Sequence, residues 1–463
     1  MKKRLVFFFL SLIIIFPVLI FYFFYRSKAS AIKANIVIDV LNSQGKFPDR
    51  FKALAQGGEE KGVRMLKNVI PQVAELYPKY IRIDHIYDFY DVVSKDNQGN
   101  LILDWSKLDE TVCDIYNTGA KPFFVLGYMP NALSGDDSLI SSPRSWQEWS
   151  FLVQKTIEHY SGTNNRLCGQ ITGYWKTDLY YEVWNEPDLE TFGKWSIYGG
   201  KDYRLLYYYS VLGAQKAKDV YPFKIGGPVT TALYRNWILN FLDFIQKNNL
   251  RIDFISWHHY SKNTDDFGDD LINLNNWLAG EKYKAFQNLP KIISEWGFDS
   301  NYNPIADTEI GAAYTIASIR NFLNYRYELA FLFEIKDGPS PSWGILGYQG
   351  EKKPRYQALQ FLNHLEGEKL FVSGEGSFVK ALASKKENLF RILLVNYDRE
   401  NKNTEIVPLT LKNLINGYYD LTLKYLDGKE IITKNIKIED SLFKKEILMP
   451  ANSIVLIKLA KTF

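Results

Sequence analysis

Two glutamates, each at the end of an apolar run, are the residues of this sequence best suited to chemistry. Glu186 lies in YYEVWNEPD (180–188), and Glu295 lies in ISEWG (293–297). If both runs are strands of one parallel barrel, the two carboxyl groups lie at the same rim and face each other across one pocket. Two opposed carboxyl groups can cleave a glycosidic bond, one as nucleophile on the anomeric carbon and the other as proton donor to the leaving oxygen.

The segments around these glutamates alternate between apolar, strand-like runs and helical stretches. This alternation is typical of a barrel or doubly wound sheet of α/β type, and eight runs match the strand number of a closed (β/α)8 barrel. The predicted strands are 35–40, 80–83, 122–126, 179–183, 223–227, 254–257, 291–294 and 329–333, with helices predicted at 63–76, 108–118, 145–160, 203–220 and 310–325.

The pattern changes after residue 366, where helical periodicity ends and short β-rich runs take over. These runs predict a small antiparallel β-sandwich packed on the barrel, with a structural role preferred over a carbohydrate-binding one. The expected domains are a signal anchor with a short linker (1–32), a catalytic barrel (33–365) and a β-sandwich (366–463). The predicted strands of the last domain are 389–396, 405–411, 418–425, 430–438 and 453–459.

The N-terminus carries a membrane signal. The basic residues KKR (2–4) precede an uncharged, apolar run at 5–25. A membrane-spanning helix needs roughly 20 such residues, whereas the core of a cleaved signal peptide has about 7 to 15. We therefore expect an uncleaved transmembrane helix, a single pass through the cell membrane and a catalytic domain outside the cytoplasm. Secretion after cleavage near ASA (29–31) is the alternative.

Composition excludes several classes of partner. A net charge of +4 over 463 residues, without a long basic run, argues against nucleic acid. Cys113 and Cys168 are too few for a disulfide framework, no bridge between them is expected, and Cys113 is read as a small buried apolar residue. The histidines are scattered except for His258 and His259, so neither a metal site nor a cofactor is expected. The oligomeric state stays open.

Five segments together resemble glycoside hydrolase family 39, which belongs to the large clan of retaining (β/α)8 glycosidases. The family includes β-xylosidases, α-L-iduronidases and bacterial exopolysaccharide glycosidases. The resemblance runs from about residue 35 to residue 365, and it implies that Glu186 is the acid/base, Glu295 the nucleophile and Asn185 a hydrogen-bond partner of the sugar 2-hydroxyl. The segments are YYEVWNEPD, DFISWHHY, KIISEWG, KPFFVLGYMP and KIGGPVT.

Further rim residues follow with the resemblance. Arg82 in IRIDH (81–85) would hold the nucleophile ionised, as an adjacent positive charge does, with a structural ion pair as the alternative. Asp84 is two residues on and shares the face of Arg82, at a position where family members often have histidine. This difference leaves the identity of the bound sugar open.

The sixth strand contributes a second pair of residues. His258 and Tyr260 are two residues apart, so both side chains can point into the pocket while His259 points away. Tyr260 is expected to donate a hydrogen bond to Glu295. For His258, a purely structural histidine is the alternative to a substrate contact.

The eighth strand departs from the family pattern. Many clan members carry a tryptophan there as a sugar platform, but this sequence reads FLFEIKDG (331–338). We expect Trp343 in the following loop, or Trp296 next to the nucleophile, to supply the stacking face. Glu334 and Asp337 either contact substrate or brace the loop.

Taken together, these features predict a retaining glycoside hydrolase that cleaves a polysaccharide or oligosaccharide outside the cytoplasmic membrane. The reaction would be a double displacement through a covalent glycosyl-enzyme. A barrel that binds glycans at the cell surface without cleaving them is the alternative class, and a transglycosylase would use the same residues. The joint presence of Glu186 and Glu295 favours catalysis.

Overall fold

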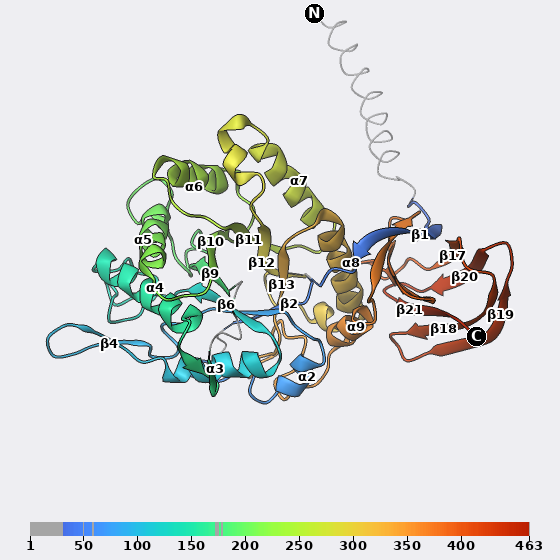
Figure 1. The fold of residues 1–463 in the computed structure, drawn as a ribbon, viewed down its shortest axis with the longest axis horizontal. Coiled ribbons are helices and arrows are strands. Elements are labelled where there is room, and N and C mark those ends of the chain that lie inside the picture. Colours follow the sequence, from blue (N-terminus) through green and yellow to red (C-terminus); the bar gives the residue numbers. More distant parts are fainter. Residues whose placement is uncertain (1–30, 50, 58–59, 172–175, 177–178, 463) are drawn as a thin grey trace, which may run out of the picture.

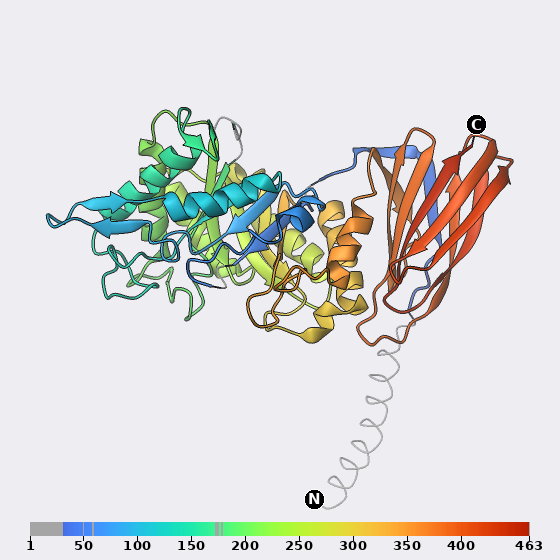
Figure 2. The ribbon, with the colours of Figure 1, turned by 90° about the horizontal axis from the view of Figure 1, so that it is seen from below.

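A closed barrel and a nine-stranded sheet beside it make up the described part of the chain (Figures 1 and 2). The computed structural model describes residues 31–49, 51–57, 60–171, 176 and 179–462. The transmembrane helix expected at 5–25 lies outside these residues. Among those that are described, no helix combines the length and hydropathy that crossing a membrane requires.

The barrel consists of eight parallel strands, and it closes where the last strand pairs with the first. Large apolar side chains such as Phe123, Phe254 and Phe331 fill its interior, so the barrel is a packed core rather than a pore. In order around the barrel, the strands are β2 (Ala53–Gln56), β3 (Tyr80–Ile83), β6 (Lys121–Leu126), β9 (Leu179–Val183), β10 (Phe223–Thr230), β11 (Phe254–Tyr260), β12 (Lys291–Gly297) and β13 (Leu329–Phe333).

Helices surround the barrel, as the sequence pattern predicts (Figure 1). Local signals fix where several of them begin: the Ser145 side chain accepts a hydrogen bond from the Glu148 N–H at the start of α4, and Thr308 does the same for Ile310 in α8. The predicted helix at 63–76 is shorter than expected. The helices are α2 (Ile70–Ala74), α3 (Ser106–Asn117), α4 (Trp146–Ser161), α5 (Tyr203–Lys216), α6 (Arg235–Lys247), α7 (Asp266–Leu278), α8 (Glu309–Tyr325) and α9 (Pro354–Leu362).

Seven of the eight predicted strands lie in the barrel, and the strand expected at 35–40 does not. Those residues begin β1 (Ile36–Lys46), which pairs with β14 and β17 in the other sheet. The first barrel strand is instead β2, a fully buried run of four residues. The prediction was wrong because an apolar run shows that a strand forms but not which sheet it joins.

The nine-stranded sheet forms a sandwich-like β-domain with its own apolar core, and it confirms the five strands predicted after residue 366. It packs beside α8, where the Tyr314 and Tyr397 rings lie 5.8 Å apart (Figure 2). Besides β1, its strands are β14 (Glu368–Ser373), β15 (Val379–Lys386), β16 (Leu389–Asn396), β17 (Glu405–Lys412), β18 (Gly417–Tyr425), β19 (Glu430–Ile438), β20 (Leu442–Met449) and β21 (Ile454–Lys461).

A disulfide joins Cys113 of α3 to Cys168, with 5.4 Å between the Cα atoms. The expectation of two unbridged cysteines was therefore wrong. The cysteines are 55 residues apart in the sequence, and they meet because the hairpin of β7 (Arg166–Leu167) and β8 (Gln170–Ile171) folds back beside α3. Nothing in the local pattern around either cysteine shows this approach.

Candidate active site

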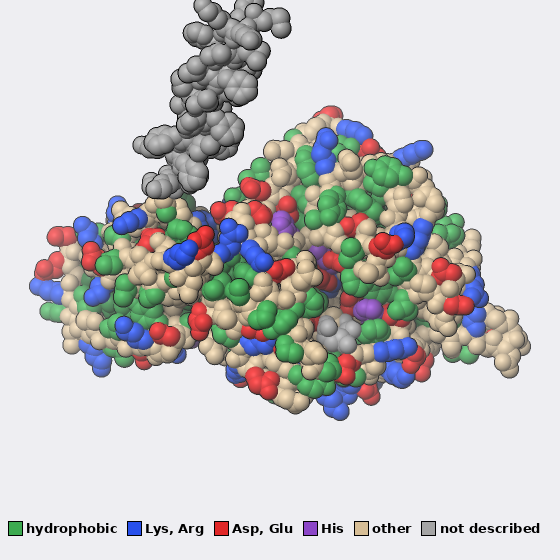
Figure 3. Space-filling model, turned by 180° about the vertical axis from the view of Figure 1, so that it is seen from behind, with side chains coloured by type: hydrophobic (Ala, Val, Ile, Leu, Met, Phe, Trp, Pro, Cys, Tyr) green, Lys and Arg blue, Asp and Glu red, His purple; other side chains and the backbone are tan. Residues whose placement is uncertain are grey.

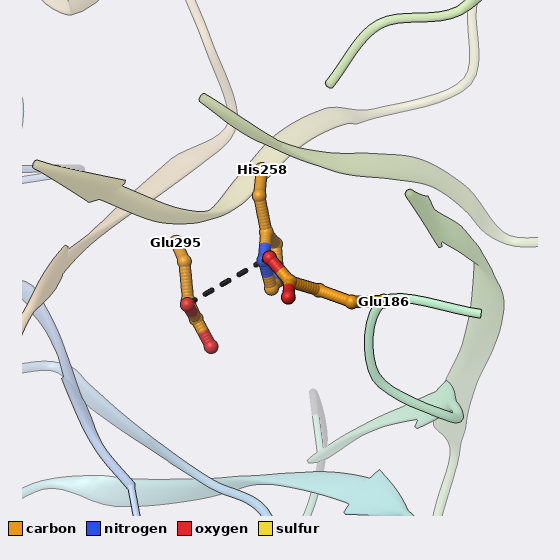
Figure 4. Close-up of side chains that lie close together, drawn as sticks. All are labelled: Glu186, His258 and Glu295. Carbon is orange, nitrogen blue, oxygen red and sulfur yellow. Dashed lines mark hydrogen bonds and ion pairs between the residues drawn. The ribbon is translucent and has the colours of Figure 1, made fainter. Parts of the chain in front are cut away.

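The two predicted glutamates face each other at the carboxyl ends of the barrel strands. Glu295 lies near the end of β12 and is 6% exposed, and Glu186 follows β9. One carboxylate oxygen of each lies within 4.8 Å of the other, with the His258 ring between the two side chains (Figure 4). The face drawn in Figure 3 has a recess near its centre where acidic and histidine side chains gather.

The backbone at Glu186 is held in an uncommon conformation. Its φ of 44° lies in the left-handed region, which residues other than glycine rarely adopt. The Glu186 N–H donates to the Val229 carbonyl at 3.1 Å, so the neighbouring strand fixes this turn. The turn sends the carboxylate inward from the end of β9 instead of letting the strand continue.

Arg82 on β3 forms hydrogen bonds with three residues of the site. Its guanidinium is 2% exposed and donates to Glu295 Oε1 at 2.6 Å, to Glu182 Oε2 at 2.9 Å and to Asn185 Oδ1 at 2.7 Å. A charge-assisted hydrogen bond of this kind stabilises the ionised carboxylate. Arg82 thus holds Glu295 in place and also orients the residue next to Glu186.

Asn185 is buried between two partners. Since its Oδ1 accepts from Arg82, its amide nitrogen is left to donate, and it does so to the Tyr128 hydroxyl at 2.9 Å. Tyr128 follows β6 and is 2% exposed. The amide is therefore fixed in orientation beside the acid at position 186.

Tyr260 and His258 both point into the site from β11, as their spacing predicts. The Tyr260 hydroxyl donates to Glu295 Oε2 at 2.9 Å. His259 points away, with Nδ1 at 2.6 Å from Asp270 of α7. Tyr260 and Arg82 therefore hold the two oxygens of Glu295 from different sides.

His258 is fully buried and contacts both glutamates. Its Nδ1 lies 2.9 Å from Glu186 Oε1 and 3.4 Å from Glu295 Oε2. Its Nε2 lies 3.4 Å from Arg82 Nη2, and because arginine only donates, Nε2 accepts in the neutral ring and Nδ1 then carries the proton toward the carboxylates. Burial alone would lower the pKa of His258, but the charges on Glu295 and Glu186 outweigh burial and raise it.

The electrostatic balance at Glu295 favours a proton more than usual. Burial raises the pKa of Glu295, and the negative charges on Glu186 and Asp84 raise it further, against the positive charges of His258 in its protonated form and of Arg82. Asp84 is half-buried after β3, and its charge acts on Arg82 as well as on Glu295. Asp84 therefore acts on the same group of charged residues as Arg82, as its spacing from Arg82 predicts.

The two candidate stacking residues behave differently. Trp296 is 1% exposed and packs on Phe267 and Phe322, between the barrel and the helices. It therefore cannot offer a face to a sugar, and that prediction was wrong because Glu295 points inward and its neighbour points outward. Trp343 is half-buried beside Phe333, its Nε1 donating to the Asp299 carbonyl at 3.0 Å.

The acidic residues after β13 form hydrogen bonds and an ion pair with other residues of the protein. Glu334 is fully buried and accepts from Ser342 Oγ at 2.7 Å and from Gln56 Nε2 at 3.3 Å. Asp337 accepts from the Gly344 N–H at 2.8 Å and forms an ion pair with Lys353 at 2.7 Å. For Asp337 these contacts favour bracing of the loop over contact with substrate.

Sequence reasoning missed Glu182, which lies on β9 with no exposed surface. Its Oε2 pairs with Arg82, and its Oε1 has no hydrogen-bond partner in the described part of the chain. A lone glutamate inside the apolar run LYYEV was the available signal, because a buried carboxylate is expensive unless it is paired. The nearby group of Glu186, His258 and Glu295 is compact enough to hold a metal ion, but the Arg82 guanidinium on Glu295 disfavours a cation.

Comparisons with known proteins point in one direction. Residues 58–430 match the family model described as Glycosyl hydrolases family 39. Two relatives named Beta-xylosidase, from Caldicellulosiruptor saccharolyticus and Geobacillus stearothermophilus, are 28% and 26% identical over 73% and 72% of this chain and 72% of each relative.

Solved structures with the same fold cover nearly the whole chain. A monomeric beta-xylosidase from Caulobacter crescentus CB15 gives a TM-score of 0.75 at 21% identity, covering 93% of this chain and 100% of that one. The GH39 enzyme from Xanthomonas axonopodis pv. citri gives 0.73 at 19% identity, covering 94% and 99%. This similarity supports a (β/α)8 barrel with an attached β-domain.

Proposed function

The chain belongs to glycosyl hydrolases family 39 and is a retaining glycosidase that hydrolyses O-glycosyl compounds, and from this premise we propose a double displacement with Glu295 as nucleophile and Glu186 as acid/base. The observation that carries the proposal is that one carboxylate oxygen of Glu186 lies within 4.8 Å of one of Glu295. Retaining enzymes hold these groups about 5 to 5.5 Å apart, whereas inverting enzymes leave about 6.5 to 9.5 Å for a water molecule.

In the first step, Glu295 attacks the anomeric carbon and Glu186 protonates the departing glycosidic oxygen. The bond to the leaving group breaks as the ester to Glu295 forms. Arg82 and Tyr260 bind the two oxygens of Glu295, so its carboxylate is aimed before substrate arrives. Asn185, fixed by Arg82 and Tyr128, is proposed to bind the sugar 2-hydroxyl.

In the second step, water cleaves the glycosyl ester. Glu186 gave its proton to the leaving group in the first step, so it can now accept a proton from the attacking water. His258 donates to Glu186 through Nδ1 and steadies its negative charge. We propose that Trp343, at the rim after β13, gives the sugar its stacking face.

We propose a xyloside-like, extracytoplasmic carbohydrate as substrate, because two relatives carry the name Beta-xylosidase. The bridge between Cys113 and Cys168 supports an oxidising compartment, where disulfides persist. The apolar run at 5–25 supports attachment to the cell membrane. Sequencing the N-terminus of the membrane-bound protein tests attachment, and a mature chain that begins near Ile32 would refute it.

Activity on aryl glycosides tests the proposed residues. The full chain should release the aryl group from an aryl β-xyloside, and Glu295→Gln should abolish release while its melting temperature stays unchanged. Glu281→Gln, which removes a surface glutamate of η2 (Glu281–Phe286), is the matched control and should act as wild type. Near wild-type turnover by Glu295→Gln would remove Glu295 as nucleophile.

A further inference from the structure

A cavity of about 840 Å³ lies between the barrel and the β-domain, on the side of the barrel away from Glu186 and Glu295. Its barrel wall comes from residues 47–49, which precede β2, and from the end of α8, which precedes β13. Both wall segments lie at the amino ends of barrel strands, whereas the two glutamates lie at the carboxyl ends. Its other wall comes from β1, β14 and β15 of the β-domain, and the volume suits a ligand of oligosaccharide size.

Four basic and two acidic residues line this cavity, and the acidic ones are Asp49 and Glu375. Arg320 of α8 donates to Glu375 Oε1 at 3.0 Å, which satisfies that pair. Lys369 is 8% exposed, and its ammonium donates to the neutral Asn324 Oδ1 at 2.9 Å. Burial lowers the pKa of Lys369, and the positive charges on Arg320 and Arg326 lower it further, against the negative charge on Glu375. An anion in the cavity would relieve this repulsion.

The uncharged part of the lining suits a sugar. Phe371 is 45% exposed and lies two residues from Lys369 on β14, so both side chains face the cavity while Leu370 enters the core of the β-domain. An exposed aromatic ring offers a flat apolar face for the C–H side of a pyranose. The amides of Asn324 and Gln44 offer donors and acceptors for hydroxyl groups.

We propose that this cavity is a second glycan site, which binds an acidic oligosaccharide through Lys369 and Arg326 with one sugar ring against Phe371. Together with the proposed function, the site would hold a polymer through its acidic sugars while a xyloside-like part of the same polymer reaches the barrel rim. It is independent of the proposed chemistry, because its barrel wall lies at the amino ends of the barrel strands and the two glutamates lie at the carboxyl ends. Binding should therefore survive the loss of catalysis.

Calorimetric titration of the full chain tests the site, with trigalacturonic acid as probe and xylotriose as its neutral counterpart. We expect the acidic trisaccharide to bind, xylotriose to bind far more weakly at this site, and added salt to weaken the acidic ligand. Lys369→Met keeps most of the side-chain volume and should reduce affinity about tenfold or more. Arg326→Asn, which keeps a residue that tolerates the left-handed backbone found there, is the second variant if Lys369→Met does not fold.

Two controls separate this site from the catalytic one. Lys216→Met removes an exposed lysine of α5, on the far side of the barrel, and should bind as wild type (Figure 1). Glu295→Gln should also bind as wild type, and Lys369→Met should cleave aryl glycosides normally. Equal affinity of the wild type and both cavity variants for trigalacturonic acid would overturn the proposal, as would absence of binding. A parallel titration with vesicles of anionic phospholipid tests a membrane surface as the ligand, and binding to the vesicles alone would also overturn the proposal.

Discussion

Two groups of buried and half-buried charged residues lie at the same end of the barrel, and they differ in the balance of negative and positive charge. The first, here called the acidic cluster, places three glutamates around one arginine and one histidine. The second, the paired cluster, sets two aspartates against two cations, with Lys353 Nζ at 2.9 Å from Asp307 and 2.7 Å from Asp337. The acidic cluster is Arg82, Glu182, Glu186, His258 and Glu295, and the paired cluster is Asp307, Asp337, Lys353 and Arg355.

This difference in charge balance indicates a different role for each cluster. In the paired cluster, Asp337 also accepts backbone N–H groups of its own loop, so its charge is satisfied and the loop is fixed. In the acidic cluster, the negative charges exceed the positive ones and a proton must be shared, which suits acid–base chemistry. Changes in the acidic cluster should therefore alter catalysis, and changes in the paired cluster should alter stability.

The largest expected effect is in the acidic cluster. Glu186→Gln should lower kcat/KM for a phenyl glycoside by about 10³, because phenolate leaves poorly without a proton. With a dinitrophenyl leaving group, which needs no proton, kcat/KM should change little, and the free energy of unfolding should stay near that of wild type. An equal loss with both leaving groups would contradict the role of Glu186 as acid.

The matching change in the paired cluster should affect stability instead. Asp337→Asn leaves Lys353 with one fewer buried partner, so the free energy of unfolding in urea should fall by about 3 kcal/mol. The folded variant should keep its kcat/KM. The surface change Glu281→Gln is the control and should shift stability by less than about 1 kcal/mol, since exposed ion pairs contribute little. A stable but inactive Asp337→Asn enzyme would show that the two clusters are not separate.

Glu182 tests how far the acidic cluster extends. Glu182→Gln removes one of the two carboxylates that bind Arg82, so the guanidinium should stabilise ionised Glu295 more strongly. The guanidinium should also shift slightly and move the Glu295 carboxylate from its position. We expect kcat/KM to fall by about tenfold. The acid limb of its pH profile should move to lower pH, because the Arg82 charge, no longer offset by Glu182, lowers the pKa of Glu295. A purely structural role would change the melting temperature and leave that limb in place.

The smallest expected effect is at Asp84. Its negative charge raises the pKa of Glu295, so Asp84→Asn should lower that pKa. Since Glu295 must be ionised to attack, activity should persist to lower pH, and the acid limb of kcat/KM should shift downward. An unchanged acid limb, or an upward shift, would show that the Asp84 charge does not act on Glu295.

The sequence predicted the centre of the site well because the signals there are local. Glu186 and Glu295 each follow an apolar run, and parallel strands of one barrel bring such ends to one rim. Alternation along β11 likewise predicted that Tyr260 points inward and His259 outward. The same rule, applied to Glu295, would have placed Trp296 in the core.

Other features could not be predicted because they depend on which segments meet. The apolar run at 36–40 could form a strand of the barrel or of the β-domain by its sequence alone. Only packing with β14 and β17 places β1 in the β-domain. Cys113 and Cys168 approach because α3 and the β7–β8 hairpin fold together. The basic cavity likewise combines α8 with β14, which are remote in the chain.

The most direct test of the double displacement is to find the residue that carries the sugar. The 2-deoxy-2-fluoro derivative of the best aryl glycoside, with a dinitrophenyl leaving group, should form a glycosyl ester that hydrolyses slowly. Mass spectrometry of the digested enzyme should then locate the sugar on the peptide that contains Glu295, and Glu295→Gln should stay unlabelled. Labelling of any other residue, or rapid turnover of the fluorosugar to a product of inverted configuration, would contradict the mechanism.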